Sequence, residues 1–131
     1  MYFADLSQYS YGDSEPDPSI LNVGWLSRAY PYTQGTVSEL FVARLLGLVQ
    51  SPVNLYRGLH FCEFCPGPEM RTTPRGLRIA EPLPGTAGNG EIRVRGTSGR
   101  IYVAPVLIHH YVTAHCYLPP AEFISAVEAE S

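Results

Sequence analysis

The sequence predicts an α+β fold in which a small antiparallel sheet, one long helix and a C-terminal helical pair surround a zinc-knuckle site of treble-clef-like type. Three observations support this fold class: a capped helical pattern in residues 37–50, two alternating strands around a glycine turn in residues 91–103, and a cysteine pair followed by a histidine pair. A chain of 131 residues is the size of one domain. We therefore expect residues 1–131 to form a single zinc-binding domain.

The N-terminal arm, residues 1–19, is rich in Tyr, Asp, Ser and Pro and is expected to be irregular. The apolar run at residues 20–26, which holds the only tryptophan, predicts a short buried strand. The long helix comes next. Thr36 begins a capping-box pattern, apolar residues then recur at helical spacing, and Pro52 ends the pattern. These features predict a helix over residues 37–50.

The middle of the chain is expected to be mostly extended or irregular. Residues 53–60 lead into the cysteine pair. Residues 66–90 hold five Pro and five Gly, which predicts a long, flexible loop with a short strand at residues 77–79. Residues 91–95 and 100–103 then alternate between apolar and polar side chains on either side of a glycine-containing turn, which predicts a β-hairpin.

The C-terminal segment carries two helical patterns. Pro105 suits the first turn of a helix, and residues 106–114 continue it. Pro119 and Pro120 precede a second pattern that runs to about residue 128 with apolar residues on one face. Together they form the expected C-terminal helical pair.

The candidate site consists of Cys62, Cys65, His110 and His115. The two cysteines are separated by two residues and the two histidines by four, a ligand set that Zn²⁺ takes up as a closed tetrahedral site. The Pro-Gly-Pro sequence after Cys65 prevents a helix from following, so we expect both thiols on a tight loop. The sequence thus predicts a structural Zn²⁺ as cofactor and no catalytic residues.

The histidine pair is chosen by spacing. His109 and His110 are adjacent and point about 100° apart on a helix, so they do not share one ion easily. The spacing from His110 to His115 lies within the zinc-finger range, but on a regular helix these side chains would point about 140° apart. We therefore expect the helix to loosen near Cys116. His60, two residues before the first cysteine, is a spare candidate.

Two other interpretations of the cysteine pair, Cys62 and Cys65, remain open. Free cysteines are often ordinary buried side chains that pack like small hydrophobic residues. A Cys-x-x-C pair is also a redox motif, but that motif normally starts a helix whose dipole lowers the thiol pKa. The prolines after Cys65 argue against such a helix.

Composition limits the classes of partner. The net charge is −3 and all nine basic residues are arginine, which argues against a nucleic-acid binder. No apolar run approaches the roughly 18 residues of a membrane helix, and the N-terminus has no signal-peptide pattern. An odd number of cysteines, three, does not suit a disulfide-stapled secreted domain. We expect a cytoplasmic protein that binds neither nucleic acid nor membranes.

Four motifs resemble a family of small bacterial proteins of unknown function, common in actinobacteria and other high-GC genomes. They are MYFxDLxxY at residue 1, LNVGWL at residue 21, RGxHxCEFCP at residue 57 and IxHYVxxHxYxPPxxF at residue 108. The resemblance covers nearly the whole chain outside residues 67–90. It implies that His60, Cys62, Cys65, His110 and His115 belong to the family pattern, and it implies no activity.

Three functions are compatible with this sequence. The first is a zinc-stabilised interaction or adaptor protein whose partner is another protein, which a closed four-ligand shell would support. The second is a metal-dependent hydrolase in which His60, both cysteines and one downstream histidine leave a coordination position open. The third is a thiol redox protein, which a metal-free Cys62–Cys65 disulfide would support. We expect the first.

Overall fold

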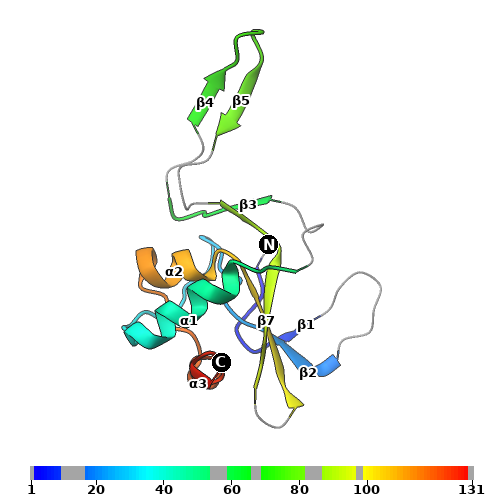
Figure 1. Cartoon of the computed structure of the whole chain (residues 1–131), viewed down its shortest axis with the longest axis vertical. Coiled ribbons are helices and arrows are strands. Elements are labelled where there is room, and N and C mark those ends of the chain that lie inside the picture. The colour runs from blue at the N-terminus through cyan, green and yellow to red at the C-terminus, as the bar shows by residue number, and fades with distance from the viewer. Residues whose placement is uncertain are drawn as a thin grey trace.

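Eight strands and three helices make up the described part of the chain (Figure 1). The computed structural model describes residues 2–9, 17–53, 59–65, 69–81, 87–96 and 99–129. The elements are β1 (Gln8–Tyr9), β2 (Asp17–Asn22), α1 (Glu39–Val49), β3 (Leu59–Phe61), β4 (Glu69–Thr72), β5 (Arg78–Glu81), β6 (Ala87–Asn89), β7 (Glu91–Arg95), β8 (Ile101–Pro105), α2 (Ile108–His115) and α3 (Ala121–Ala129). The expected α+β class is confirmed.

The main sheet has four strands in the order β1-β2-β8-β7. The predicted hairpin is confirmed, since β7 and β8 pair antiparallel with Val94 opposite Tyr102. The prediction of a purely antiparallel sheet is wrong, because β2 and β8 run parallel with Leu21 opposite Tyr102. The physical reason is the long connection between these strands, which contains α1 and is long enough to bring β8 back beside β2 in the same direction. Hairpin signals describe only strands joined by short turns.

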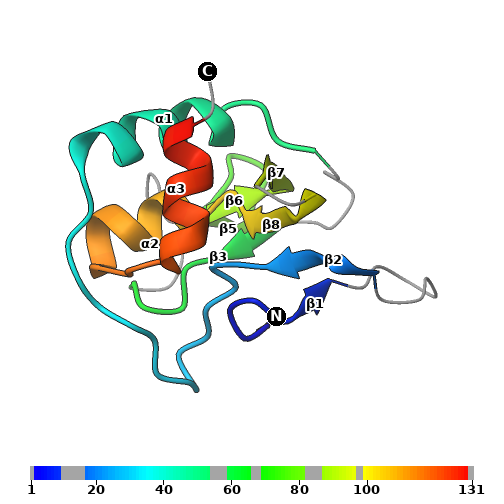
Figure 2. The same cartoon turned by 90° about the horizontal axis from the view of Figure 1, so that it is seen from below.

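The three helices lie together on one side of this sheet (Figure 2). Phe123 of α3 meets Phe41 of α1 edge-on at 6.2 Å between ring centroids and meets Tyr102 of β8 at 5.9 Å. All three side chains are buried, so this aromatic contact joins two helices to the sheet. No helix in the described ranges has the length and apolar character needed to cross a membrane.

Helix boundaries differ slightly from those predicted. Helix α1 begins at Glu39, and its N-cap is Ser38, whose Oγ accepts a hydrogen bond from the backbone N–H of Phe41 at 3.1 Å. Thr36 is therefore not the cap. Helix α2 begins at Ile108, because Pro105 is the last residue of β8 and not the first turn of the helix.

The strand expected at residues 20–26 begins earlier, at Asp17, and ends at Asn22. Two residues after the strand, Gly24 has φ of +78°, and its N–H donates to Asp5 Oδ1 at 2.9 Å. This bond ties the N-terminal arm to the body, as does that of Leu6 N–H to the Asn22 carbonyl at 2.7 Å. The arm also contributes β1, so it is more regular than expected.

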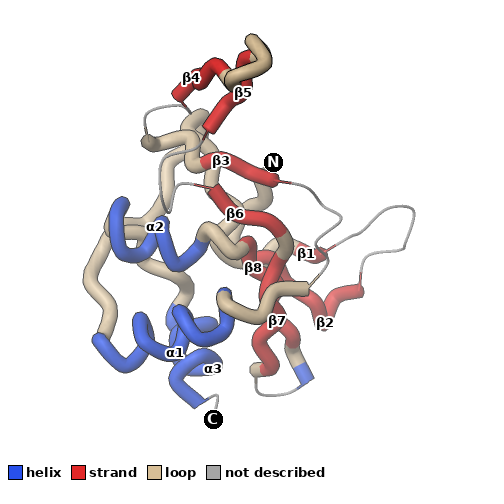
Figure 3. The backbone as a smooth tube through the Cα atoms, turned by 45° about the horizontal axis from the view of Figure 1, so that its top comes forward, coloured by secondary structure: helices blue, strands red, loops and turns tan. Residues whose placement is uncertain are grey.

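The segment expected to be a loop, residues 66–90, contains three strands, β4, β5 and β6. Strands β4 and β5 form an antiparallel hairpin that projects from the rest of the molecule (Figure 1). Strand β6 pairs with β3, and this two-stranded sheet lies between the projecting hairpin and the body (Figure 3). Residues 54–58, 66–68 and 82–86 lie outside the described ranges, and with them part of the predicted extended segment and loop.

Candidate metal centre

Two separate parts of the chain bring the four predicted residues together. Cys62 follows β3 directly, and Cys65 ends the short turn after it. His110 lies in the first turn of α2, and His115 is the last residue of that helix. The donor atoms of the four side chains all lie within 4.8 Å of one another, so these residues could bind a metal ion.

Three side chains converge closely on His115. Its Nε2 lies 3.3 Å from Cys62 Sγ, 3.3 Å from Cys65 Sγ and 3.2 Å from His110 Nε2. Cys65 Sγ is also 3.2 Å from His110 Nε2. Each histidine therefore directs the same nitrogen, Nε2, into the group.

These separations fit a tetrahedral ion. With Zn–S bonds of about 2.3 Å and Zn–N bonds of about 2.0–2.1 Å, the edges of a tetrahedron are roughly 3.3 Å between nitrogens and 3.6 Å between sulfur and nitrogen. The observed nitrogen–nitrogen distance is 3.2 Å and the sulfur–nitrogen distances are 3.2–3.3 Å. Small outward shifts of the thiols would accommodate the ion, and the two-sulfur, two-nitrogen donor set suits a borderline-soft metal.

The end of α2 makes this geometry possible. Cys116 has φ of +56° and ψ of +26°, the left-handed conformation that ends many helices. The backbone N–H groups of Cys116 and Tyr117 both donate to the Tyr111 carbonyl. The helix therefore stops at His115, as the expected loosening near Cys116 requires, and the Nε2 atoms of His110 and His115 approach each other instead of diverging.

A neighbouring segment holds this helix end in place. Tyr32 Oη donates a hydrogen bond to the His115 carbonyl at 2.9 Å, and the N–H of Gly35 donates to the Cys116 carbonyl at 2.9 Å. Both carbonyls belong to the last turn, where no further helical donor exists. Sequence reasoning missed Tyr32, and no local signal in the sequence could have revealed its role.

Aromatic rings surround the turn that carries the thiols. Phe64 lies between the two cysteines in sequence and packs edge-on against Tyr32 at 5.2 Å and Tyr111 at 6.0 Å. Its ring is also 5.4 Å from that of His115. Cys62 is buried at 5% exposure, whereas the other three donor residues are half-buried. Phe64 thus covers one side of the site.

Burial shifts the pKa values of two members of the group, Cys62 and His110. It raises the pKa of the Cys62 thiol, to which the neighbouring Cys65 adds, so this thiol is protonated at neutral pH without a metal. Burial also lowers the pKa of His110, and repulsion from His115 and His109 lowers it further. A neutral imidazole is the form that binds a metal, and a metal would displace the thiol proton.

The structure leaves His109 and Cys116 out of the group. The His109 side chain is half-buried and does not belong to it, and Cys116 is exposed. The backbone of His60 lies in β3 opposite Gly88, but its side chain lies outside the described part. All three cysteines are free thiols, with no disulfide between Cys62 and Cys65.

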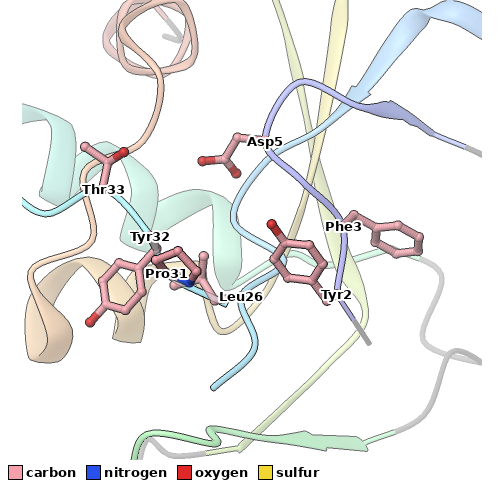
Figure 4. Close-up of a pocket in the computed structure, with 7 residues that line it drawn as sticks. All are labelled: Tyr2, Phe3, Asp5, Leu26, Pro31, Tyr32 and Thr33. Carbon is pink, nitrogen blue, oxygen red and sulfur yellow. The ribbon is translucent and has the colours of Figure 1, made fainter. Parts of the chain in front are cut away.

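A cavity of about 190 Å³ lies between the N-terminal arm and the segment that follows Leu26 (Figure 4). It is lined by Tyr2, Phe3, Asp5, Leu26, Pro31, Tyr32 and Thr33. Tyr32 lines the cavity and also supports the metal group, but none of the four donor residues lines the cavity. The cavity and the candidate metal site are therefore distinct.

Comparison with known proteins identifies a family but no relative of known activity. No curated protein and no solved structure matches the chain. One family model, described as a domain of unknown function (DUF7919), matches residues 1–128. The match includes the cysteine turn, the projecting hairpin, α1, α2 and all but the last residue of α3. Because it covers almost the whole chain, the protein belongs to the DUF7919 family of domains of unknown function.

Proposed function

We propose that this protein is a zinc-stabilised domain that acts by binding another protein, and that its metal has a structural role. The observation that carries the proposal is the convergence of Cys62, Cys65, His110 and His115, with donor atoms within 4.8 Å of one another. Four nitrogen and sulfur donors complete the shell of a tetrahedral Zn²⁺. They leave no coordination position for an activated water, which a metal hydrolase needs.

The ion would join two distant parts of the chain. The turn at residues 62–65 and the helix at residues 108–115 are linked by a long connection that includes the β4–β5 hairpin. Closing so long a loop by a metal removes conformational entropy from the unfolded chain and stabilises the fold. A reducing cytoplasm would keep both thiols available for the metal.

The first test is metal content. Protein purified without chelators should contain one Zn²⁺ per chain by elemental analysis. X-ray absorption at the zinc edge should show two sulfur neighbours at about 2.3 Å and two nitrogen neighbours at about 2.0–2.1 Å. Protein that lacks stoichiometric metal and forms a Cys62–Cys65 disulfide would support the redox alternative instead. A shell of three protein ligands and one water would support the hydrolase alternative.

The second test uses matched variants. Cys62→Ser and His115→Ala each remove one predicted ligand and should lower the melting temperature by more than about 10 °C, because breaking the site costs several kcal/mol. His109→Ala and Cys116→Ser remove neighbouring residues of the same types that lie outside the group, and they should retain the metal. Calorimetry on the four variants checks the ligand choice, which equal losses from His109→Ala and His115→Ala would refute.

A further inference from the structure

The β4–β5 hairpin is the part of the described chain that lies farthest from the helices and the main sheet (Figure 1). Its turn is well defined by hydrogen bonds. The N–H of Thr73 donates to the Leu77 carbonyl at 2.7 Å, and the N–H of Leu77 donates to Thr73 Oγ1 at 3.1 Å. Gly76 takes the positive φ, +83°, that this turn requires. The hairpin therefore presents a fixed tip, residues 73–77, to the solvent.

Charge is distributed unevenly between this hairpin and the rest of the chain. The hairpin, residues 69–81, contains three arginines and two glutamates and carries +1. Glu69 and Glu81 lie opposite each other at the end away from the turn, so the charges nearest the turn are the positive ones of Arg75 and Arg78. The rest of the chain has six arginines and ten acidic residues and carries −4. Arg75 and Arg78 are exposed. A positively charged tip on a negatively charged body indicates a tip that meets an acidic surface.

The tip also carries an unusually exposed apolar side chain. Leu77 is 64% exposed, more than any other large apolar side chain that the structure describes. The next, Tyr30 and Leu40, are 50% and 49% exposed. Leu77 lies next to Arg78 and two residues from Arg75. An exposed leucine between two arginines is suited to enter an apolar pocket whose rim carries carboxylates.

Ordered segments lie on both sides of the hairpin in the sequence. Cys65 precedes β4 by four residues, and β6, which follows β5, pairs with β3. At Gly88 of β6 an added Cβ would lie 3.3 Å from Val106 Cγ1, so this strand runs close against the segment that enters α2. The hairpin is thus flanked in the sequence by the cysteine turn and by β6, and both of these segments belong to the body.

We propose that the tip of the β4–β5 hairpin is the partner-binding surface and inserts into a concave, acidic site on another protein. The proposal rests on the proposed function, because it takes the partner to be a protein. A convex tip of a few residues makes a specific interface only when a cleft surrounds it. Nucleic acid fits less well, since specific phosphate binding commonly uses six or more contacts, and Leu77 would have no partner on a sugar–phosphate backbone.

Site-specific photo-crosslinking tests the surface. A benzoylphenylalanine is introduced at position 77 in the full-length protein, expressed in its host cells. Matched positions are Leu40 and Leu46 on α1, which are also large, apolar and exposed, at 49% and 42%. We expect a protein adduct from position 77 and none from the α1 positions. A nuclease-sensitive adduct at position 77 would overturn the proposal in favour of nucleic acid.

The adduct's partner is then identified, purified and titrated against the protein by calorimetry. The double substitution of Arg75→Glu and Arg78→Glu should weaken binding at least about 100-fold, because it reverses two charges at the interface. Leu77→Ala should weaken it about 10-fold or more. The control Arg28→Glu reverses an exposed charge on the body and should change affinity less than about twofold. Affinity that is equal in all variants would contradict the proposal.

These outcomes separate the two proposals. An adduct from Leu40 or Leu46 but not from position 77 would refute the hairpin as the surface and leave a protein-binding function standing. No adduct from any position would argue against both. Zinc analysis of each variant, which should remain at one ion per chain, shows that a loss of binding comes from the tip and not from the metal site.

Discussion

At the scale of single residues, Cys116 controls the direction in which His115 points. Its left-handed backbone, with φ of +56°, ends α2 one residue after the ligand. Such a conformation costs a residue with a Cβ roughly 1–2 kcal/mol, whereas glycine adopts it freely. The thiol of Cys116 is exposed and lies outside the metal group. Cys116 therefore contributes to the site through its backbone conformation and not through its side chain.

Cys116→Gly should therefore stabilise the protein by about 1 kcal/mol and raise the melting temperature by a few degrees. Cys116→Ala removes the same thiol but keeps the Cβ, and it should leave the melting temperature nearly unchanged. Thermal unfolding of the zinc-loaded proteins by circular dichroism measures both. A destabilised Cys116→Gly variant would show that the thiol itself has a role.

Asp5 fastens the N-terminal arm to two distant segments. Its carboxylate accepts hydrogen bonds from the Gly24 N–H at 2.9 Å and from Tyr117 Oη at 2.8 Å. Tyr117 is fully buried, and burial together with the nearby Asp5 charge raises its pKa. The hydroxyl thus remains protonated and acts as the donor in this bond.

Asp5→Ala should cost about 1–3 kcal/mol, because it leaves a buried hydroxyl without its acceptor. Denaturant unfolding should show the loss as a lower midpoint with an unchanged slope. Asp5→Asn retains one acceptor oxygen and should cost less. If both variants were as stable as the parent, the arm would not be held by this side chain.

The sequence allowed the four donor residues to be predicted, but not the residues that hold them in place. Spacing alone selected Cys62, Cys65, His110 and His115, because ligand pairs for zinc recur at short, fixed separations. Tyr32 supports the site through a hydrogen bond to a carbonyl 83 positions away along the chain. Contacts at that separation leave no trace in spacing or periodicity.

At the scale of elements, the long helix shows what periodic patterns can determine. The apolar spacing predicted residues 37–50, and α1 spans Glu39–Val49. The predicted cap, Thr36, is wrong by two residues, since Ser38 is also of a residue type that caps helices and takes this role. The outcome depends on the backbone that leads into the helix: Ser38 is extended, with ψ of 156°, and its Oγ reaches the Phe41 N–H.

Ser38→Ala should lower the free energy of unfolding by about 1 kcal/mol, the usual contribution of an N-cap. Thr36→Ala should change it by a few tenths of a kcal/mol at most, since exposed positions without such a role contribute little. Chemical denaturation of the two variants compares the caps directly. The prediction would be reversed if Thr36→Ala proved the more destabilising change.

Strand partners were harder to predict than strands. The pairing of β7 with β8 follows from a short turn, but the parallel pairing of β2 with β8 joins residues about 80 positions apart. The β4–β5 hairpin was also missed, except near residues 77–79, where a short strand was expected. Five prolines and five glycines in residues 66–90 suggested a loop, although one of the glycines, Gly76, makes the tight turn of the hairpin.

At the scale of the whole molecule, the metal group lies between two bodies of structure. On one side are the main sheet and the three helices, whose buried side chains form the hydrophobic core. On the other side are the β3–β6 pair and the projecting hairpin (Figure 3). Of the four donors, only Cys62 is buried within that core. Most of the core therefore packs without contact with the metal group.

Removal of the metal should therefore loosen the molecule unevenly. Hydrogen exchange followed by mass spectrometry, with and without a chelator, should show faster exchange in β3, β6 and the end of α2. Strands β7 and β8 should remain protected, because their ladder packs against α1 and α3 and not against the metal group. The Cys116→Ser variant serves as the control that retains all four ligands. Uniform loss of protection across the chain would mean that the metal supports the entire core. Unchanged protection in β3 and β6 would mean that the pairing of these two strands does not depend on the metal.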